Sequence, residues 1–103
     1  MGRWFPVRVE GESMSPTLRP GDFLAVRPPR AGEPAEGQIV LVRSGAAEEV
    51  KRVVRAPAGD EVWIAGDNAE HAEHYSRRGA VPLSEIAGIV RVRYWPPRRI
   101  RRL

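Results

Sequence analysis

The stretch IAGIVRVRYW, residues 86–95, is the longest of the strand-like runs in this 103-residue chain. Val90 and Val92 alternate with Arg91 and Arg93, and a spacing of two places the apolar side chains on one face of a β-strand. Shorter runs of the same kind, rich in Val, Ile and aromatic residues, are PVRVEG (6–11), DFLAVR (22–27), QIVLVR (38–43), EVKRVVR (49–55) and EVWIAG (61–66).

Turn-forming segments such as RPGD (19–22) and APAGD (56–60) separate these runs, and no stretch has a 3.6-residue apolar repeat of helical length. The pattern predicts an all-β fold of six or seven short strands, arranged as a coiled sheet or a partly open barrel. We expect residues 1–103 to form a single domain. Residues 69–82 lack strand character and are predicted to be a loop with room for one helical turn.

The composition excludes several classes of site and of protein. The chain has no cysteine, which excludes disulfides, thiolate metal sites and a cysteine nucleophile. Its longest apolar runs, FLAV (23–26) and IVLV (39–42), are far shorter than the ~20 residues of a membrane-spanning helix. The start of the chain has no apolar segment typical of a secretory signal, so we expect a cytoplasmic protein.

The formal net charge is +4, and much of the positive charge lies in a basic C-terminal tail, PPRRIRRL (96–103). Such a tail could contact nucleic acid, an acidic lipid surface or an acidic partner, or it could simply be solvated. It lacks the interleaved aromatic residues of a single-strand binder, so nucleic acid is not an expected partner. Without a membrane anchor, only weak surface contact with a membrane through this tail is expected.

Ser13 is the third residue of the segment GESMSPTLRPGDFLAV (11–26) and is the candidate nucleophile. Pro16 fixes one backbone angle and disfavours a helical Ser15, while Gly11 gives the chain freedom just before Ser13. A serine on such a stiff turn is exposed and oriented, and its own N–H can stabilise an oxyanion, as a nucleophile requires. A plain Ser/Thr/Pro turn that caps its own backbone would have the same sequence.

Lys51 is the only lysine, whereas the other sixteen of the 17 basic residues are arginine. A neutral lysine can act as a general base, and burial lowers the lysine pKa, but arginine stays protonated. The neighbouring Val50, Val53 and Val54 are apolar, as burial requires. A charged Glu49 on the same strand face would oppose neutralisation, so we expect Glu49 to lie in the preceding turn. An exposed lysine that happens to be unique is the alternative.

The two histidines, His71 and His74, lie in the polar segment AEHAEHYS (69–76), where we expect solvated side chains rather than a Ser-His-Asp arrangement. A further hypothesis is that these histidines contact a metal-binding precursor.

Four segments in this order resemble the serine–lysine peptidases that include type I signal peptidases and the self-cleaving SOS repressors. The first segment is similar to their Ser-Met-x-Pro-Thr-Leu nucleophile box. The other three resemble a Gly-Asp-Ile-Val strand box, a lysine box with a Pro-x-Gly-Asp turn, and a Gly-Asp-Asn box with a following Val-Pro…Ile-x-Gly segment; here they read EGQIVLVR (36–43), VKRVVRAPAGDEV (50–62) and GDNAEHAEHYSRRGAVPLSEIAGIV (66–90).

The resemblance implies a signal-peptidase-like catalytic domain in which Ser13 is the nucleophile and Lys51 the general base, with no metal or cofactor. Gly11 and Met14 would belong to the nucleophile and oxyanion turn. The resemblance also implies structural support from Asn68, from Ser76 and from an ion pair of Arg52 with Asp67.

Some positions depart from the family pattern. Tyr75 replaces the usual aspartate of the late box, and Ala72 stands where signal peptidases have a lysine-binding serine, for which only a shifted Ser76 could substitute. Gly11 replaces a hydroxyl residue of the oxyanion hole. Losing one such donor costs ~10²–10³ in rate, so slow or specialised turnover is expected.

Within this family, the short chain and the RYWPPRR segment (93–99) of its tail resemble the nickel-type superoxide dismutase maturation proteases. The function predicted from this resemblance is removal of an N-terminal propeptide from a precursor protein, with nickel superoxide dismutase as the leading substrate. The alternatives are signal-peptidase-like processing of exported proteins, and a non-catalytic basic β-domain that would need neither Ser13 nor Lys51.

Overall fold

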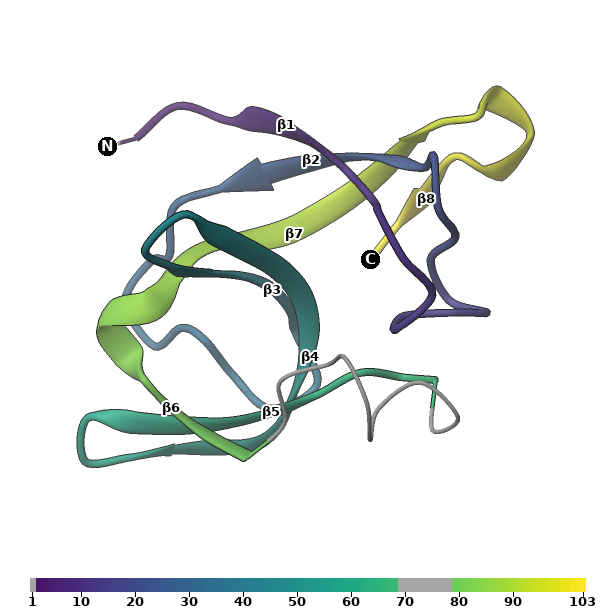
Figure 1. Cartoon of the computed structure of the whole chain (residues 1–103). Coiled ribbons are helices and arrows are strands. Elements are labelled where there is room, and N and C mark those ends of the chain that lie inside the picture. The colour runs from purple at the N-terminus through teal and green to yellow at the C-terminus, as the bar shows by residue number, and fades with distance from the viewer. Residues whose placement is uncertain (1, 69–78) are drawn as a thin grey trace.

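The computed structural model describes residues 2–68 and 79–103, and these residues form one antiparallel sheet (Figure 1). The strand order is β1-β2-β7-β3-β4-β5-β6, and β8 pairs with β7 off this path. The strands are β1 (Phe5–Arg8), β2 (Phe23–Arg27), β3 (Ile39–Ser44), β4 (Ala47–Ala58), β5 (Glu61–Ala65), β6 (Gly79–Pro82), β7 (Ile86–Trp95) and β8 (Arg101–Arg102). Two short 3₁₀ helices complete the elements, η1 (Leu83–Glu85) and η2 (Pro97–Arg99).

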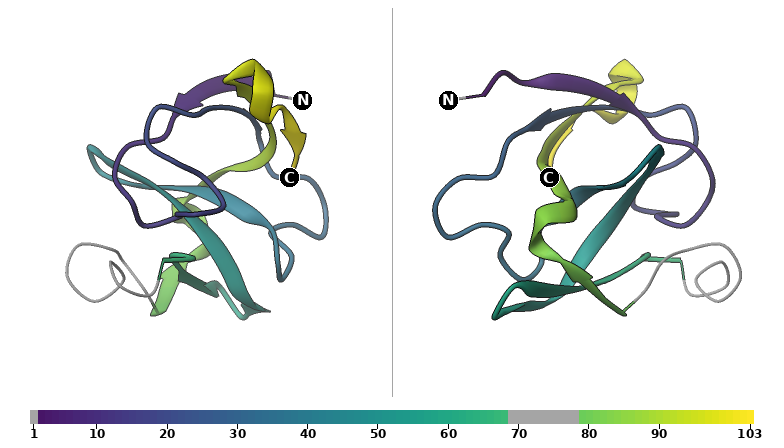
Figure 2. Two further views of the ribbon diagram at one scale, coloured as in Figure 1. Left: turned by 90° about the vertical axis from the view of Figure 1, so that its right-hand side faces the viewer. Right: turned by 60° about the vertical axis from the view of Figure 1, so that its left-hand side comes forward.

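The sheet coils without closing, because β1 and β6 at its two ends do not pair with each other. Figures 1 and 2 show β1 and β2 at one end of the molecule and β5 and β6 at the other, joined through β7, β3 and β4. The predicted all-β fold, a coiled and open sheet of mostly short strands, is therefore confirmed.

The core has two parts, one on each side of the central strands β3 and β7. In β3, Ile39 and Leu41 pack into one cluster, while Val40 and Val42 pack into the other. Successive side chains of a strand point to opposite faces, so a strand covered on both faces has a continuous apolar run. This requirement explains the uninterrupted IVLV of residues 39–42.

The loop prediction for residues 69–82 is wrong at its C-terminal end. Residues 79–82 form β6, which pairs with β5 and buries Val81 in the second part of the core. Pro82 argued against a strand in the sequence, because proline lacks the N–H that a strand donates. β6 lies at the edge of the sheet, however, where a missing N–H is tolerated. The rest of the prediction, 69–78, lies outside the described residues.

The basic C-terminal segment, residues 96–103, folds back against the sheet. After η2, the two residues of β8 pair with Val92 and Arg93 of β7, and the Leu103 N–H donates to the Arg91 carbonyl at 2.8 Å. Within the described part of the chain, no helix has the length and hydropathy needed to cross a membrane.

Leu18 lies in the loop between β1 and β2, and its side chain is 0% exposed in the first core cluster. A substitution at this position therefore measures how much this loop contributes to the stability of the core. We expect Leu18→Ala to lower the free energy of unfolding by about 2–5 kcal/mol, through lost burial and the cavity left behind. Ile100→Ala, at a side chain that is 63% exposed, should change it by less than about 0.5 kcal/mol. Equal losses for the two variants in urea titrations would contradict this packing.

Candidate active site

The Ser13 loop, residues 9–22, connects β1 to β2 and is closed at its base by two backbone hydrogen bonds. The Val9 N–H donates to the Asp22 carbonyl at 2.8 Å, and the Gly21 N–H donates to the Val9 carbonyl at 2.9 Å. Between these bonds, the side chains of Met14 and Leu18 are buried in the first part of the core. The loop that carries Ser13 is thus fixed by packing as well as by hydrogen bonds.

Gly11 supplies the backbone conformation that precedes Ser13. Its φ of +76° lies in the left-handed region, which side chains with a Cβ disfavour. Gly11 therefore adopts a backbone conformation that few other residues would adopt, as expected from the sequence. The same φ angle explains why a glycine stands where signal peptidases often have a hydroxyl residue.

A groove of about 540 Å³ brings the two candidate catalytic residues together. Residues 7–14 line one side, and Leu41 with residues 48–51 of the β3–β4 hairpin line the other. Ser13 and Lys51 therefore line the same groove although they come from distant parts of the chain. Gly11 and Met14 also belong to its lining.

Lys51 lies in the middle of β4, opposite Val40 of β3, and its side chain is only 2% exposed. Burial lowers the pKa of Lys51 from its ordinary value near 10.5, and the charge of Glu49 raises it; burial is the larger effect. The folded protein thus makes Lys51 lose its proton at a lower pH than an exposed lysine would.

Two expectations about the surroundings of Lys51 are wrong. Glu49 does not lie in the turn: β4 already begins at Ala47, so Glu49 is a half-buried strand residue on the same face as Lys51. Val54 is 48% exposed and does not help to bury the lysine, whereas Val53 is buried as expected.

Asn68 fixes the peptide groups on both sides of Ser13. Its backbone N–H donates to the Ser13 carbonyl at 2.8 Å, and its side-chain amide donates to the Glu12 carbonyl at 2.9 Å. The Ser15 N–H donates to the same Glu12 carbonyl at 3.0 Å. In a trans peptide the N–H points opposite to the C=O, so the Ser13 N–H is directed away from Asn68.

Gly66 allows this close approach. A Cβ atom at position 66 would lie 2.5 Å from the Ser13 carbonyl oxygen, so any other residue would push the two segments apart. Sequence reasoning missed Gly66; its signal is a glycine directly before Asp67 and Asn68, at the end of an apolar strand.

Asp67 joins the Ser13 loop to β4. It accepts hydrogen bonds from Thr17 Oγ1 at 2.7 Å and from Arg52 at 2.7 and 3.2 Å. The implied pair of Arg52 with Asp67 is present, and Thr17 is a partner that sequence reasoning missed. Burial raises the pKa of Asp67, but the hydrogen bonds from Arg52 and Thr17 and the Arg52 charge outweigh it, so the pKa is lowered.

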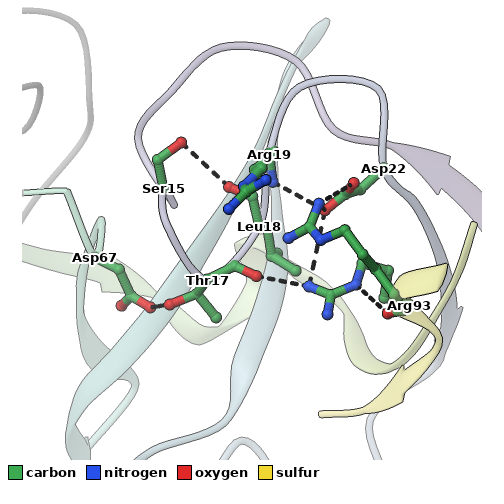
Figure 3. Close-up of polar contacts among 8 residues, drawn as sticks. Ser15, Thr17, Leu18, Arg19, Asp22, Asp67 and Arg93 are labelled. Atoms are coloured by element: carbon green, nitrogen blue, oxygen red, sulfur yellow. Dashed lines mark hydrogen bonds and ion pairs between the residues drawn. The ribbon is translucent and has the colours of Figure 1, made fainter. Parts of the chain in front are cut away.

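The C-terminal part of the Ser13 loop, residues 17–22, is held by hydrogen bonds and ion pairs of buried charged side chains (Figure 3). Arg93 of β7 donates to the Thr17 carbonyl at 2.7 Å and to the Arg99 carbonyl at 2.6 Å. Asp22 accepts from the Arg19 N–H at 2.9 Å and from the Arg99 guanidinium at 2.8 Å. These contacts were not anticipated, because the sequence shows arginines in β7 and in the tail without showing what they face.

The remaining predicted site residues fall in the segment 69–78. Ser76, His71, His74 and the family departures at Ala72 and Tyr75 all lie outside the described residues. Their predicted roles stay predictions.

A family model described as Peptidase S24-like matches residues 2–90 of this chain. The comparison of this chain with curated proteins found no match. The matched range contains the Ser13 loop, β4 with Lys51 and the segment 66–68.

Gly66→Ala tests the contact between residues 66–68 and the Ser13 loop. We expect the new Cβ to break the hydrogen bond from the Asn68 N–H to the Ser13 carbonyl, so amide exchange at Asn68 should become faster. Gly45→Ala is the matched control: it strains a positive φ of +60° in the β3–β4 turn but meets no atom within 4 Å. Unchanged Asn68 exchange in Gly66→Ala, or equal acceleration in both variants, would contradict this role.

Proposed function

The chain belongs to the peptidase S24-like family of serine peptidases, and on this premise we propose that it is a Ser/Lys endopeptidase with Ser13 as nucleophile and Lys51 as general base. The observation that carries the proposal is a buried lysine that lines one groove with a serine on a fixed loop. Arginine could not replace this lysine, since it does not lose its proton in proteins.

The substrate would bind as an extended segment beside β1. Among the described strands β1 pairs only with β2, so its outer edge can accept backbone hydrogen bonds from a peptide, and residues 7–11 line the groove. A peptide in this position would have its scissile bond next to Ser13.

Neutral Lys51 Nζ would remove the proton from Ser13 Oγ as the oxygen attacks the scissile carbonyl carbon. The resulting oxyanion would receive a hydrogen bond from the Ser13 N–H, whose direction follows from the contacts of Asn68 with the Glu12 and Ser13 carbonyls. Lys51 would then pass the proton to the leaving amine, and water would hydrolyse the acyl-enzyme.

We propose as the specific substrate a precursor from which an N-terminal propeptide is removed, with the precursor of nickel superoxide dismutase first. The four boxes resemble the serine–lysine peptidases as a group, and the support for this subtype is the resemblance of the RYWPPRR segment to the tails of the nickel-type superoxide dismutase maturation proteases. The proposed reaction needs no cofactor, and the cytoplasm is the proposed compartment.

The test is incubation of the purified protein with that precursor, followed by mass spectrometry. We expect two products, the free propeptide and the shortened enzyme, and no cleavage by Ser13→Ala or Lys51→Met. Cleavage by Ser13→Ala would exclude the proposed nucleophile. An intact nickel superoxide dismutase precursor, together with Ser13-dependent cleavage of an exported protein, would reject the subtype and keep the peptidase.

Lys51→Met also separates catalysis from stability. Met has a similar length and no charge, so we expect the variant to be inert yet at least as stable as the wild type at neutral pH. The dependence of wild-type stability on pH follows from proton binding. Between the lowered pKa of Lys51 in the folded protein and the ordinary value of 10.5, the unfolded chain binds a proton that the folded chain does not. Wild-type stability should therefore rise with pH in this window, and that rise should be absent in Lys51→Met.

The pH profile of cleavage should report the same amine. We expect the rate to increase about tenfold per pH unit below the Lys51 pKa and to level off above it, at a pH below 10.5. Because the Glu49 charge raises this pKa, Glu49→Gln should move the profile to lower pH. A profile that stays in place or moves to higher pH in this variant would argue for a different base.

A further inference from the structure

A second pocket, of about 570 Å³, is also lined in part by the Ser13 loop and is dominated by arginine. The loop contributes Pro16 and Thr17 to it, whereas Ser13 lines the catalytic groove. Five arginines from four different elements line this arginine pocket: Arg52, Arg93, Arg99, Arg101 and Arg102.

The positive charge of the arginine pocket is only partly balanced by the described residues. No acidic side chain is among its lining residues. Asp67 binds Arg52 and Asp22 binds Arg99, so two acidic side chains are paired with this set of five guanidinium groups. Arg101 and Arg102 are exposed and lie on the two-residue strand β8.

Arg93 is the deepest member, with only 5% of its surface exposed. Its short hydrogen bonds go to the carbonyls of Thr17 and Arg99, and the carboxylate of Asp22 is 3.8 Å away. Burial lowers the pKa of Arg93, the charges of Arg99, Arg101 and Arg19 lower it further, and Asp22 opposes them. A buried cation repelled by its neighbours is stabilised when an anion enters.

We propose that the arginine pocket binds carboxylates of an acidic segment in the protein that this peptidase cleaves. The inference rests on the proposed function, which supplies a protein substrate. Guanidinium groups bind carboxylates through paired, charge-assisted hydrogen bonds. Ser13 and Thr17 are four residues apart in one loop, a separation of at most ~14 Å, so one bound polypeptide can reach both the groove and the pocket.

The lining favours a peptide over a nucleic acid. Besides the arginines, Thr17 and the buried Ile39, it consists of Pro16 and Leu103, which can contact the aliphatic parts of a peptide. None of the lining residues is aromatic, whereas single-strand binders stack bases on aromatic side chains.

Binding can be measured with a fluorescein-labelled decapeptide of alternating Glu and Gly, with its Gln-Gly counterpart and with a ten-nucleotide oligothymidylate. We expect the Glu peptide to bind most tightly, and Arg101→Gln combined with Arg102→Gln to weaken it about tenfold. The matched control is Arg30→Gln with Arg98→Gln, which removes the same charge from exposed positions outside the pocket and should weaken binding less than about threefold.

Equal weakening by the two double variants would overturn the proposal, because the attraction would then depend on net charge alone. Tighter binding of oligothymidylate that depends on Arg101 and Arg102 would replace the acidic peptide with a nucleic acid and also overturn it.

Cleavage then links the arginine pocket to the substrate. For a precursor that carries an acidic segment, the Arg101→Gln, Arg102→Gln variant should raise KM about tenfold and leave kcat unchanged, and replacing the acidic residues of the precursor by amides should abolish this difference. Pocket-dependent binding without any cleavage would reject the peptidase and leave the anion site. Cleavage with an unchanged KM would reject the arginine pocket as a substrate site and leave the peptidase.

Discussion

The removal of one lysine side chain from water is the constraint on which the proposed chemistry depends. Lys51 is almost completely buried in β4, and the neighbouring Glu49 charge reduces but does not cancel the effect of burial on its pKa. Burying an ammonium group is costly, so burial shifts the proton equilibrium of Lys51 toward the neutral amine, and the Glu49 charge opposes this shift only in part. The fold thereby holds a base that is neutral at a lower pH than a free lysine would be.

The Ser13 loop completes this arrangement because it is fixed from several directions. Met14 and Leu18 attach it to the core, Asn68 binds the carbonyls next to Ser13, and Asp67 connects Thr17 to the strand of Lys51. Each contact restricts a different part of the loop. The serine and the lysine are therefore positioned relative to each other by β4 and by the segment 66–68 together.

The sequence predicted most of the fold because its alternation of apolar and polar residues matches the strands closely. The predicted strand boundaries were wrong where the local sequence signal was weak or where a turn was tighter than expected. β6 contains a glycine and a proline, and only its pairing with β5 makes it a strand. The β3–β4 turn needs just Gly45 and Ala46 between paired Ser44 and Ala47, so Glu49 falls within the strand.

The candidate site was predictable in part: the Arg52–Asp67 pair followed from the family resemblance, whereas the catalytic roles inferred for Ser13 and Lys51 from their chemistry stay predictions. It was not predictable where a residue serves a contact between distant segments. Gly66 is needed because the Ser13 carbonyl lies against it, and Arg93 because the Thr17 carbonyl does. Such requirements arise only when the chain is folded.

Since Lys51 is the only lysine, labelling the protein with lysine that carries ¹³C at the ε position gives a single side-chain signal in NMR spectra. Titration of that signal in the folded protein measures the pKa of Lys51 directly. We predict a midpoint clearly below 10.5, because burial lowers this pKa. A midpoint at or above 10.5 would contradict it, because the amine would then carry a proton when it has to accept one from Ser13.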